Sequence, residues 1–336
     1  MIKTAIDKLV KSQDLTREET KEVFSQMMDG KATDAQIGAF LTALRIKGET
    51  VEEITGAVEV MREKGTKIHP KSSITLDTCG TGGDKTNTFN ISTATAFVVA
   101  GTGISVAKHG NKCVSSKCGS ADVLTALGIN INTTASKTEQ AIDKANIGFA
   151  FAPVFHKAMK HAIGPRQEIG IRTIFNILGP MTNPADAKYQ LIGVYDPELT
   201  ETVANVLKEL GSKKAFVVHG YPLDEISSCG KTKITRLGED GTIDTYYITP
   251  QDYGIRQAEL SELKGGTPEE NAQILLDILD NKQGPRYDIV VLNAAAAIVA
   301  AGLAETVEEG IVLAKKSISS GNALKCLEKL RQITNG

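Results

Sequence analysis

Apolar and polar residues alternate with a helical period over the first seventy residues. Ile37 and Leu41, for example, are four positions apart, the spacing of residues on one face of a helix. Three stripes of this kind follow a Thr-x-x-Glu/Gln capping box, whose two side chains satisfy backbone N–H groups at a helix start. The boxes are Thr16-Arg-Glu-Glu19, Thr33-Asp-Ala-Gln36 and Thr50-Val-Glu-Glu53. Gly30 and Gly48 stand where helices would end, so the pattern predicts a small all-helical domain over residues 1–70.

After residue 70 the pattern changes to short β-rich runs that alternate with helical ones. The predicted strands lie around residues 74–79, 104–107, 147–151, 189–195, 214–219 and 288–292. Helical patterns lie at 199–210 and 293–301, the last forty residues are helical again, and residues 232–248 predict an antiparallel hairpin. Alternation of strands and helices favours a largely parallel sheet with right-handed crossovers. We therefore expect an α/β fold over residues 71–336, with a central sheet flanked by helices.

Composition narrows the class of protein. The chain has 336 residues, a length that suits two domains, and its formal net charge is -2. Aromatic residues make up 5% of the chain and tryptophan is absent, so neither charge nor stacking platforms favour nucleic-acid binding. The longest run of small apolar residues, 293–304, is shorter than the ~20 residues that cross a bilayer. We expect no nucleic-acid partner and no membrane association.

The cysteines and the first residues bear on location. The five cysteines are an odd set without Cys-x-x-Cys spacing, which fits a reducing compartment better than a disulfide framework. Cys113 and Cys118 would be half of a metal site, but no second pair at ligand spacing completes it. The first residues lack the apolar core of a signal peptide. A cytoplasmic location is therefore expected.

The densest chemical signal is the segment from Asp77 to Thr93, DTCGTGGDKTNTFNIST, which follows a predicted strand and begins a predicted helix. Three glycines within four positions let backbone N–H groups point at one centre, and a helix N-terminus adds positive dipole. The segment therefore predicts a phosphate-binding loop. Asn90, Ser92 and Thr93 either only cap the helix or also contact phosphate or a metal, and their place beside the loop favours contact.

Three further segments place polar residues and glycines at predicted strand ends. Lys108 offers a point charge to phosphate, with a plain solvated turn as the alternative. Arg166 can bind a carboxylate through two parallel hydrogen bonds, whereas we expect Arg172 to pair within the fold. Asp224 and Glu225 are adjacent carboxylates of the kind that holds Mg²⁺, with an exposed turn as the alternative.

Common nucleotide and hydrolase motifs are incomplete. The glycine loop does not match GxxxxGK[ST], which disfavours a P-loop NTPase. It does not match G-x-G-x-x-G either, and no acidic ribose ligand completes a dinucleotide fingerprint. A G-x-S-x-G elbow is absent, which disfavours an α/β-hydrolase.

Six motifs in one order resemble the anthranilate phosphoribosyltransferase family, whose fold is the nucleoside-phosphorylase-like phosphoribosyltransferase fold. They are GTGGD (80–84), NIST (90–93), KHGN (108–111), GSADVLTALG (119–128), the segment 166–184 and LDE (223–225). The resemblance covers nearly the whole chain. It implies transfer of the 5-phosphoribosyl group from 5-phosphoribosyl-1-diphosphate to the amine of anthranilate, in tryptophan biosynthesis. It also implies Mg²⁺ as cofactor, a homodimer through the small domains, a segment near 166–186 that joins the small domain, and an active site in the cleft between the domains.

The resemblance also assigns residues to each part of the site. The diphosphate sugar would lie on Gly80, Gly83, Asp84, Thr88, Asn90, Ile91, Ser92, Thr93, Lys108, Lys112, Cys113, Val114, Ser115, Ser116 and Ser120. Mg²⁺ would be held by Ser92, Asp224 and Glu225, and anthranilate by Gly80, Asn111 and Arg166. Lys108 and His109 are the expected catalytic residues. Lys108 would neutralise the departing diphosphate, and His109 would either relay a proton or position the amine as a neutral ring.

Two departures and two rival functions qualify the resemblance. Tyr221-Pro222 replaces a glycine-containing turn before LDE, and Met181-Thr182 stands where an apolar pair is common. A pyrimidine nucleoside phosphorylase is the rival within the fold. It typically has a longer chain and serine, with an arginine following, after Lys-His, where this chain has Gly110-Asn111. A relative that only binds nucleic acid would lose the cleft motifs and gain a basic face.

Overall fold

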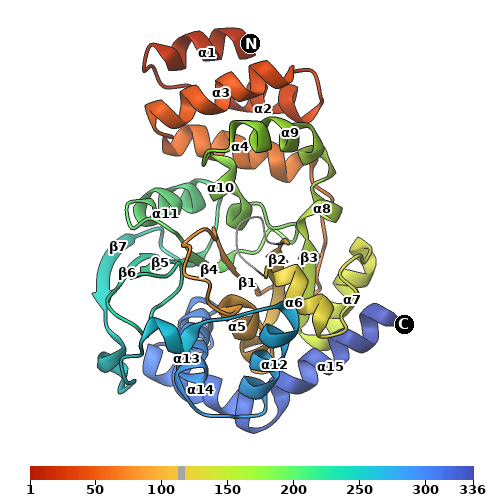
Figure 1. Cartoon of the computed structure of the whole chain (residues 1–336), viewed down its shortest axis with the longest axis vertical. Helices are drawn as coiled ribbons and strands as arrows, with labels where there is room; N and C mark the ends of the chain where they lie inside the picture. The colour runs from red at the N-terminus through yellow and green to blue at the C-terminus, as the bar shows by residue number, and fades with distance from the viewer. Residues whose placement is uncertain (113–117) are drawn as a thin grey trace.

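The computed structural model describes residues 1–112 and 118–336 (Figure 1). Four helices form a bundle at one end of the molecule. They are α1 (Ile2–Val10), α2 (Arg17–Met28), α3 (Asp34–Lys47) and α4 (Val51–Lys64). All three predicted capping boxes are present at the starts of α2, α3 and α4. Gly48 ends α3 with a φ of +90°, and Gly30 turns the chain after α2 with a φ of +70°, so the predicted helical unit is confirmed.

Seven strands form one sheet in the order β3-β2-β1-β4-β5-β6-β7. Neighbouring strands from β3 to β5 are parallel, and β6 is antiparallel to both β5 and β7. The sheet begins at β1, the chain then adds β2 and β3 on one side, and β4 follows on the other side of β1. The loops after β1 and β4 therefore separate at a topological switch point, where open α/β sheets bind ligands. The strands are β1 (Thr75–Gly80), β2 (Ser105–Gly110), β3 (Ile147–Phe151), β4 (Tyr189–Gly193), β5 (Lys214–Gly220), β6 (Thr232–Leu237) and β7 (Ile243–Ile248).

The remaining helices connect and cover the strands. The longer ones are α5 (Ile91–Ala100), α6 (Ser120–Ala126), α7 (Ala135–Ala145), α9 (Lys160–Ile169), α11 (Leu199–Glu209), α12 (Pro268–Leu279), α13 (Pro285–Ala300), α14 (Val307–Ser319) and α15 (Asn322–Asn335). The single-turn ones are α8 (Ala152–Phe155), η1 (Lys157–Met159), α10 (Phe175–Leu178), η2 (Gly179–Met181), η3 (Pro250–Tyr253) and η4 (Leu260–Leu263). Among the described residues, no helix combines the length and apolar character that crossing a membrane requires.

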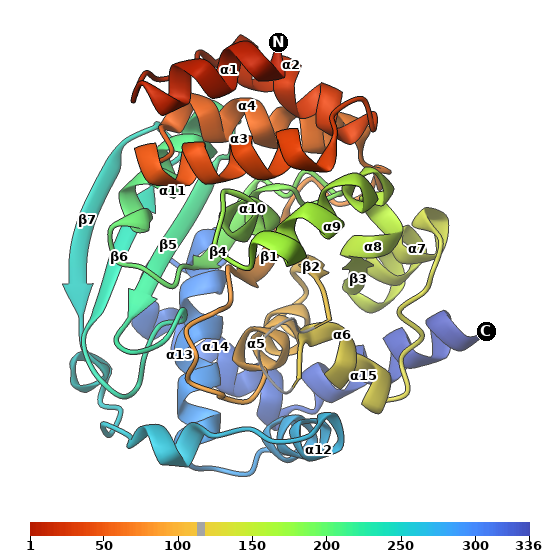
Figure 2. The same ribbon diagram turned by 45° about the horizontal axis from the view of Figure 1, so that its top comes forward.

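Helices cover both faces of the sheet (Figures 1 and 2). On one face, α5 and α12 to α15 pack with the strands into one apolar core. On the other face, the core passes through α11 and α10 into the bundle, so that Val217 of β5 and Phe24 of α2 belong to the same cluster. The bundle and the sheet thus share a continuous apolar core. The expected division of the chain at residue 70 stays a prediction.

Between β3 and β4 the chain leaves the sheet, runs along the bundle and returns (Figure 2). Helix α9 packs against α2 and α3, and α10 contacts α4. Arg62 of α4 fastens the returning chain, because its Nε donates to the carbonyl of Met181 at 2.8 Å and its Nη1 to Asp186 at 2.6 Å. The segment between β3 and β4 therefore packs on the α1–α4 bundle.

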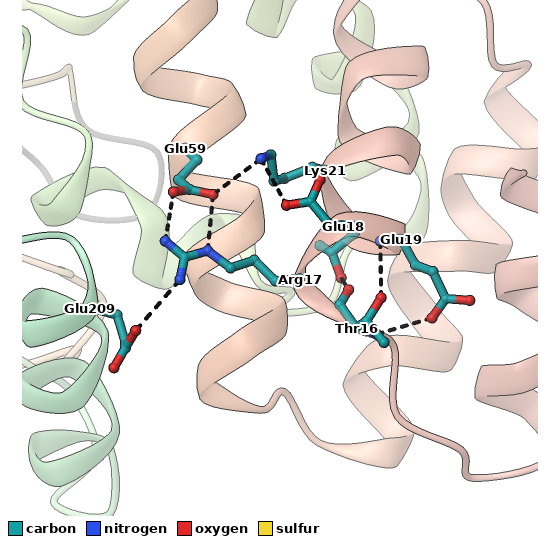
Figure 3. Close-up of polar contacts among 8 residues, drawn as sticks. Thr16, Arg17, Glu18, Glu19, Lys21, Glu59 and Glu209 are labelled. Atoms are coloured by element: carbon teal, nitrogen blue, oxygen red, sulfur yellow. Dashed lines mark hydrogen bonds and ion pairs between the residues drawn. The ribbon is translucent and has the colours of Figure 1, made fainter.

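A second polar contact joins the bundle to α11 (Figure 3). Arg17 of α2 binds Glu59 of α4 through Nε and Nη2, at 3.1 and 2.6 Å. Its Nη1 lies 3.5 Å from the carboxylate of Glu209 at the end of α11. Lys21 and Glu18 extend the same network on the bundle surface.

The strand predicted around residues 288–292 is wrong, because these residues lie inside α13. The run is apolar and β-branched, but Pro285 stands in the first turn, where proline favours a helix start. The helix packs against β4, α5 and α14, so most of its side chains are buried. A helix buried on every side carries the same unbroken apolar run as a buried strand. The hairpin at residues 232–248 is confirmed as β6 and β7.

Candidate active site

The ends of four parallel strands surround one cavity. β1, β2, β4 and β5 each end in glycine, and the loops beyond β1, β2 and β5 line a cavity of about 470 Å³, a volume that suits a small organic ligand. Every described residue that the sequence assigned to a substrate, to the metal or to catalysis lines this cavity. Cys113, Val114, Ser115 and Ser116 lie outside the described residues.

The glycine loop after β1 is folded against an acidic group. Gly82 and Gly83 have φ values of +67° and +83°, which glycine adopts without strain. The N–H of Gly82 donates to Oδ2 of Asp224 at 2.7 Å. A Cβ on Gly80 would lie 2.8 Å from the same oxygen, so glycine leaves room for that carboxylate. Asp84 accepts hydrogen bonds from the N–H and the hydroxyl of Thr86, at 3.0 and 2.7 Å.

The start of α5 faces the cavity without a capping side chain. Asn90 is the N-cap residue but makes no cap hydrogen bond. Its Nδ2 donates instead to the carbonyl of Cys118 at 3.1 Å, and its Oδ1 accepts from Asn271 at 3.0 Å. Within the described part of the chain, the buried hydroxyl of Thr93 has no hydrogen-bond partner. Simple capping therefore does not explain these polar residues, whereas the positive end of the helix dipole suits an anion.

Three carboxyl groups, Asp84, Asp224 and Glu225, lie close together beneath the loop. Burial and the neighbouring Asp84 raise the pKa of Asp224 to about 7. Burial and Asp224 raise the pKa of Glu225 well above its usual range, while the N–H of Ser92 donates to the Glu225 carboxylate. These side chains are half-buried, and carboxylates in mutual contact are stabilised by a cation. The exposed-turn alternative for Asp224 and Glu225 is therefore wrong.

The donor set fits Mg²⁺ more closely than other metals. Mg²⁺ is usually bound by one or two carboxylates together with substrate phosphates and water, all through oxygen. The described residues hold no set of three His, Cys, Asp or Glu side chains already arranged around one metal position. Asp224, Glu225 and the hydroxyl of Ser92 supply oxygen only, so phosphate oxygens of a ligand would complete the coordination.

Lys108 is buried between this acidic group and the sheet. Its side chain is 3% exposed, and its Nζ donates to the carbonyl of Thr78 and, at 3.4 Å, to the hydroxyl of Ser92. The solvated turn considered for Lys108 is therefore wrong. Its charge opposes the raised pKa of both Asp77 and Glu225. Lys108 thus supplies a fixed positive charge beside the oxygen ligands.

Asp77 and Asn183 support the site and were not assigned a role from the sequence. Asp77 is fully buried in β1 and accepts hydrogen bonds from the N–H of His109 at 3.2 Å and from Nδ2 of Asn183 at 2.7 Å. The same Nδ2 lies 2.7 Å from the carbonyl of Ala107. A carboxylate between apolar strand positions was the signal for Asp77. Asn183 carries no such signal, because its partners lie 76 and 106 residues away in sequence.

His109 is a buried, neutral ring. Its Nδ1 lies 3.0 Å from the carbonyl of Gly179, and its ring centroid is 5.2 Å from that of His156. Burial, together with His156, lowers the pKa of His109 to about 3. With Nδ1–H donating to Gly179, Nε2 carries the lone pair, and among the described residues it has no partner. Position and charge state favour the neutral positioning role over proton relay.

Arg166 supplies a guanidinium without a carboxylate partner. Its Cζ lies 4.9 Å from the ring centroid of Phe175, and burial alone lowers its pKa. None of the ion pairs among the described residues includes it. Asn111 lines the same cavity, and its carbonyl accepts from the Ser120 hydroxyl at 3.3 Å. A half-buried guanidinium left unpaired by the protein suits a carboxylate on a ligand.

Comparison with protein families covers almost the entire chain. Residues 3–65 match the model described as "Glycosyl transferase family, helical bundle domain". Residues 72–324 match the model described as "Glycosyl transferase family, a/b domain". The first match corresponds to the α1–α4 bundle, and the second contains every strand of the sheet.

Individual relatives and solved structures agree with these models. An anthranilate phosphoribosyltransferase of Acetivibrio thermocellus is 55% identical over 336 residues, which cover 100% of this chain and 97% of that protein. The crystal structure of the Thermus thermophilus enzyme has a TM-score of 0.94 at 38% identity and covers 99% of both chains. The Saccharomyces cerevisiae enzyme in complex with PRPP and Mg has a TM-score of 0.91 at 29% identity, covering 99% of this chain and 98% of that one. The yeast enzyme is also solved in complex with 4-fluoroanthranilate, with a TM-score of 0.89 at 28% identity, covering 99% of this chain and 97% of that one.

The six motifs, the arrangement of the cavity and the match over the whole length point the same way, and this chain belongs to the anthranilate phosphoribosyltransferase family.

Proposed function

We propose that this protein transfers the 5-phosphoribosyl group of 5-phosphoribosyl-1-diphosphate to the amine of anthranilate, releasing diphosphate, as a step of tryptophan biosynthesis. The observation that carries the proposal is the lining of one cavity. A glycine loop, a helix start and half-buried carboxylates supply what a metal-bound diphosphate needs, and the unpaired Arg166 supplies what an aromatic carboxylate needs. A pyrimidine nucleoside has no carboxylate, so the rival phosphorylase activity would give the Arg166 guanidinium no anionic group to bind.

At the diphosphate end, the bond from the ribose C1 to oxygen breaks and negative charge grows on the leaving group. We propose that Ser92, Asp224 and Glu225 hold Mg²⁺, which when bound offsets that charge as a Lewis acid. Lys108 adds a fixed positive charge, the N–H groups of the glycine loop donate to the phosphate oxygens, and the positive end of the α5 dipole lies beside them. Because Lys108 is buried and already oriented, little reorganisation is needed as the charge develops.

At the acceptor end, the nitrogen lone pair of anthranilate forms the new bond to C1 and then loses a proton. An aromatic amine is uncharged at neutral pH, so no strong base is required before attack. Arg166 would orient the carboxylate, and Asn111 and the neutral ring of His109 would hold the amine in line with C1. The neutral ring of His109 supports positioning rather than proton relay.

A fluorescence assay tests the activity and the carboxylate contact together. Anthranilate fluorescence should fall only when the diphosphate sugar and Mg²⁺ are both present. Arg166→Ala should raise the KM for anthranilate by about tenfold or more, the value of a lost charged hydrogen bond, and should change the KM for the diphosphate sugar far less. Arg256, which forms an exposed ion pair with Glu262 at 2.8 Å, gives the matched control Arg256→Ala.

Two results would contradict the proposal. The first is phosphate-dependent cleavage of a pyrimidine nucleoside without anthranilate turnover. The second is tight DNA binding without turnover. An equal rise of both KM values in Arg166→Ala would remove Arg166 from the anthranilate site and leave the activity itself standing.

We further propose a cytoplasmic homodimer formed through the helical bundle. The bundle carries two of the most exposed large apolar side chains among the described residues, Val10 at 71% and Ile46 at 81%, which supports an association surface there. The odd set of cysteines without disulfide spacing supports the location. Light scattering should give twice the chain mass of 35.8 kDa, and Ile46→Glu should shift the value toward the monomer.

A further inference from the structure

Arg172 binds the glycine loop from the segment that joins α9 to α10. Its Nη2 donates a hydrogen bond to the carbonyl oxygen of Gly83. Its guanidinium carbon lies 4.0 Å from the centroid of the Tyr195 ring. Tyr195 follows β4, and its N–H donates to the hydroxyl of Thr81 at 3.1 Å. The expected pairing of Arg172 within the fold is therefore present, and its partner is the loop that the sequence assigns to phosphate.

The hydrogen bond to Gly83 determines which way one peptide group faces. The Gly83–Asp84 peptide is trans, since Tyr221-Pro222 is the cis bond found among the described residues. In a trans peptide the C=O and N–H point in opposite directions, so the N–H of Asp84 points away from Arg172. Across residues 1–112 and 118–336, neither the N–H of Gly83 nor that of Asp84 has a protein acceptor. Both therefore remain available to a ligand in the cavity.

Glycine makes this orientation easy to lose. Gly83 has a φ of +83°, and without a Cβ its backbone can also adopt the opposite sign of φ at little cost. A Cβ at this position would lie 3.0 Å from Nη2 of Arg172, so a side chain there would crowd the guanidinium. Without the hydrogen bond the peptide could turn over and present its carbonyl oxygen to the cavity, where it would repel phosphate oxygens.

We propose that Arg172 is a positioning residue, which fixes the Gly83–Asp84 peptide so that its N–H donates to the diphosphate sugar. The inference rests on the proposed function, since it takes the phosphate ligand from there. Tyr195 holds the guanidinium carbon over its ring, which helps to orient the donating N–H. A lysine at residue 172 could reach the carbonyl of Gly83 as a point charge but could not stack in this way.

The two arginines of this segment therefore have different roles. Arg166 is unpaired and lines the cavity, as a group that awaits a ligand does. Arg172 also lines the cavity, but its guanidinium is engaged by Gly83 and Tyr195. Loss of Arg166 should weaken anthranilate binding, and loss of Arg172 should weaken binding of the diphosphate sugar, although both belong to the same stretch of chain.

The test compares Arg172→Ala and Arg172→Lys with the parent, with Arg256→Ala as the matched control on an exposed ion pair. Steady-state kinetics gives kcat and the KM for each substrate. Calorimetric titration with 5-phosphoribosyl-1-diphosphate and Mg²⁺, without anthranilate, gives Kd. Arg172→Ala should raise the KM and Kd for the diphosphate sugar by about tenfold or more, with the KM for anthranilate changed by less than about twofold. The Kd of Arg172→Lys for the diphosphate sugar should fall between those of the parent and of Arg172→Ala. The Kd of Tyr195→Phe should be closer to that of the parent than the Kd of Tyr195→Ala is.

Three other outcomes overturn the proposal. A rise confined to the KM for anthranilate would make Arg172 a ligand of that substrate, and an equal rise for both substrates would make it a general structural residue. Unchanged binding of the diphosphate sugar would remove its role in the loop. If Tm shows that Arg172→Ala does not fold, Arg172→Lys decides by the same criteria. A parent protein that binds the diphosphate sugar but does not consume anthranilate would defeat the proposed function and leave this inference testable by Kd.

Discussion

Burial sets neighbouring ionisable side chains beneath the cavity in different charge states. It raises the pKa of Asp77 to about 6, against the opposing charge of Lys108. Together with His156, it lowers the pKa of His109 to about 3. The cation of this group is therefore Lys108, while His109 contributes a lone pair and no charge. A positive charge is thus placed next to the carboxylates of Asp224 and Glu225, and the ring of His109 carries none.

The neutral state of His109 should be visible in the stability of the protein at acid pH. Its pKa falls from 6.5 to about 3 on folding, so between these values the unfolded chain binds more protons. Stability is therefore present above pH 6.5 and is lost as pH falls toward 3. At pH 5 the loss from this group is about 2 kcal/mol. Urea unfolding at pH 7.5 and at pH 5 gives two free energies of unfolding. In His109→Gln the difference between them should be smaller than in the parent by about 2 kcal/mol.

Exposed His69 gives the matched control for this measurement, because His69→Gln changes a histidine outside the cavity. His156, whose pKa burial also lowers, keeps its own contribution in both variants. A His109→Gln protein with the same pH dependence as the parent would show that His109 is not held neutral.

Elements that follow local rules were predicted from the sequence, and elements decided by packing were not. The threonine boxes begin α2, α3 and α4 because both partners of each cap lie within four residues. Residues 288–292 lie in a helix that packs against α14 and α5, and their unbroken apolar run does not distinguish a buried helix from a buried strand. The candidate site divides in the same way. Its motif residues meet in one cavity, whereas Asp77, Asn183 and Tyr195 act through partners more than thirty residues away.

The end of β4 offers a test of how a strand positions Asp224 and Glu225, the carboxylates that we propose as metal ligands. A Cβ on Gly193 would lie 1.5 Å from the carbonyl oxygen of Asp224, and backbone cannot yield as a flexible side chain does. Gly193→Ala should therefore displace Asp224 and Glu225. We expect the Mg²⁺ concentration for half-maximal turnover to rise by about tenfold or more, as when the support of a metal ligand is lost.

Gly38→Ala in α3 is the control, because its Cβ would meet only Ile169 Cγ2, at the ordinary distance of 3.5 Å. Turnover measured across a Mg²⁺ titration compares the two variants. A Gly193→Ala protein with the Mg²⁺ dependence of the parent would show that the loop after β5 tolerates the shift.

At the scale of the whole molecule, the helical bundle is held to the α/β layer by apolar packing and by two arginines of different kinds. Arg62 is 16% exposed in its side chain, and it binds both the carbonyl of Met181 and the carboxylate of Asp186. The contact of Arg17 with Glu209 is longer, at 3.5 Å, and its glutamate is 46% exposed. The carboxylates of both pairs are about half exposed, at 54% for Asp186 and 46% for Glu209, so water and salt weaken both ion pairs. The part-buried hydrogen bond to the carbonyl of Met181 is what distinguishes Arg62.

The two contacts should therefore differ in their effect on stability. Arg62→Ala should lower the free energy of unfolding by about 2 kcal/mol, since it leaves a buried carbonyl unsatisfied. Glu209→Ala should lower it by less than about 1 kcal/mol, as for exposed ion pairs. Urea unfolding of both variants at low and at high salt measures the difference. A larger loss in Glu209→Ala would reverse this ranking and make the α11 contact the main polar link.

The excursion of the chain between β3 and β4 has a consequence for synthesis on the ribosome. Helices α1 to α4 emerge early, but α9 and α10, which pack on α2, α3 and α4, follow about a hundred residues later. Until then the nascent helices have an uncovered apolar side, the kind of surface that chaperones recognise. β4, which lies between β1 and β5 in the sheet, follows α10 along the chain. The bundle is therefore covered only after the chain as far as α10 has emerged, and an isolated N-terminal fragment should aggregate.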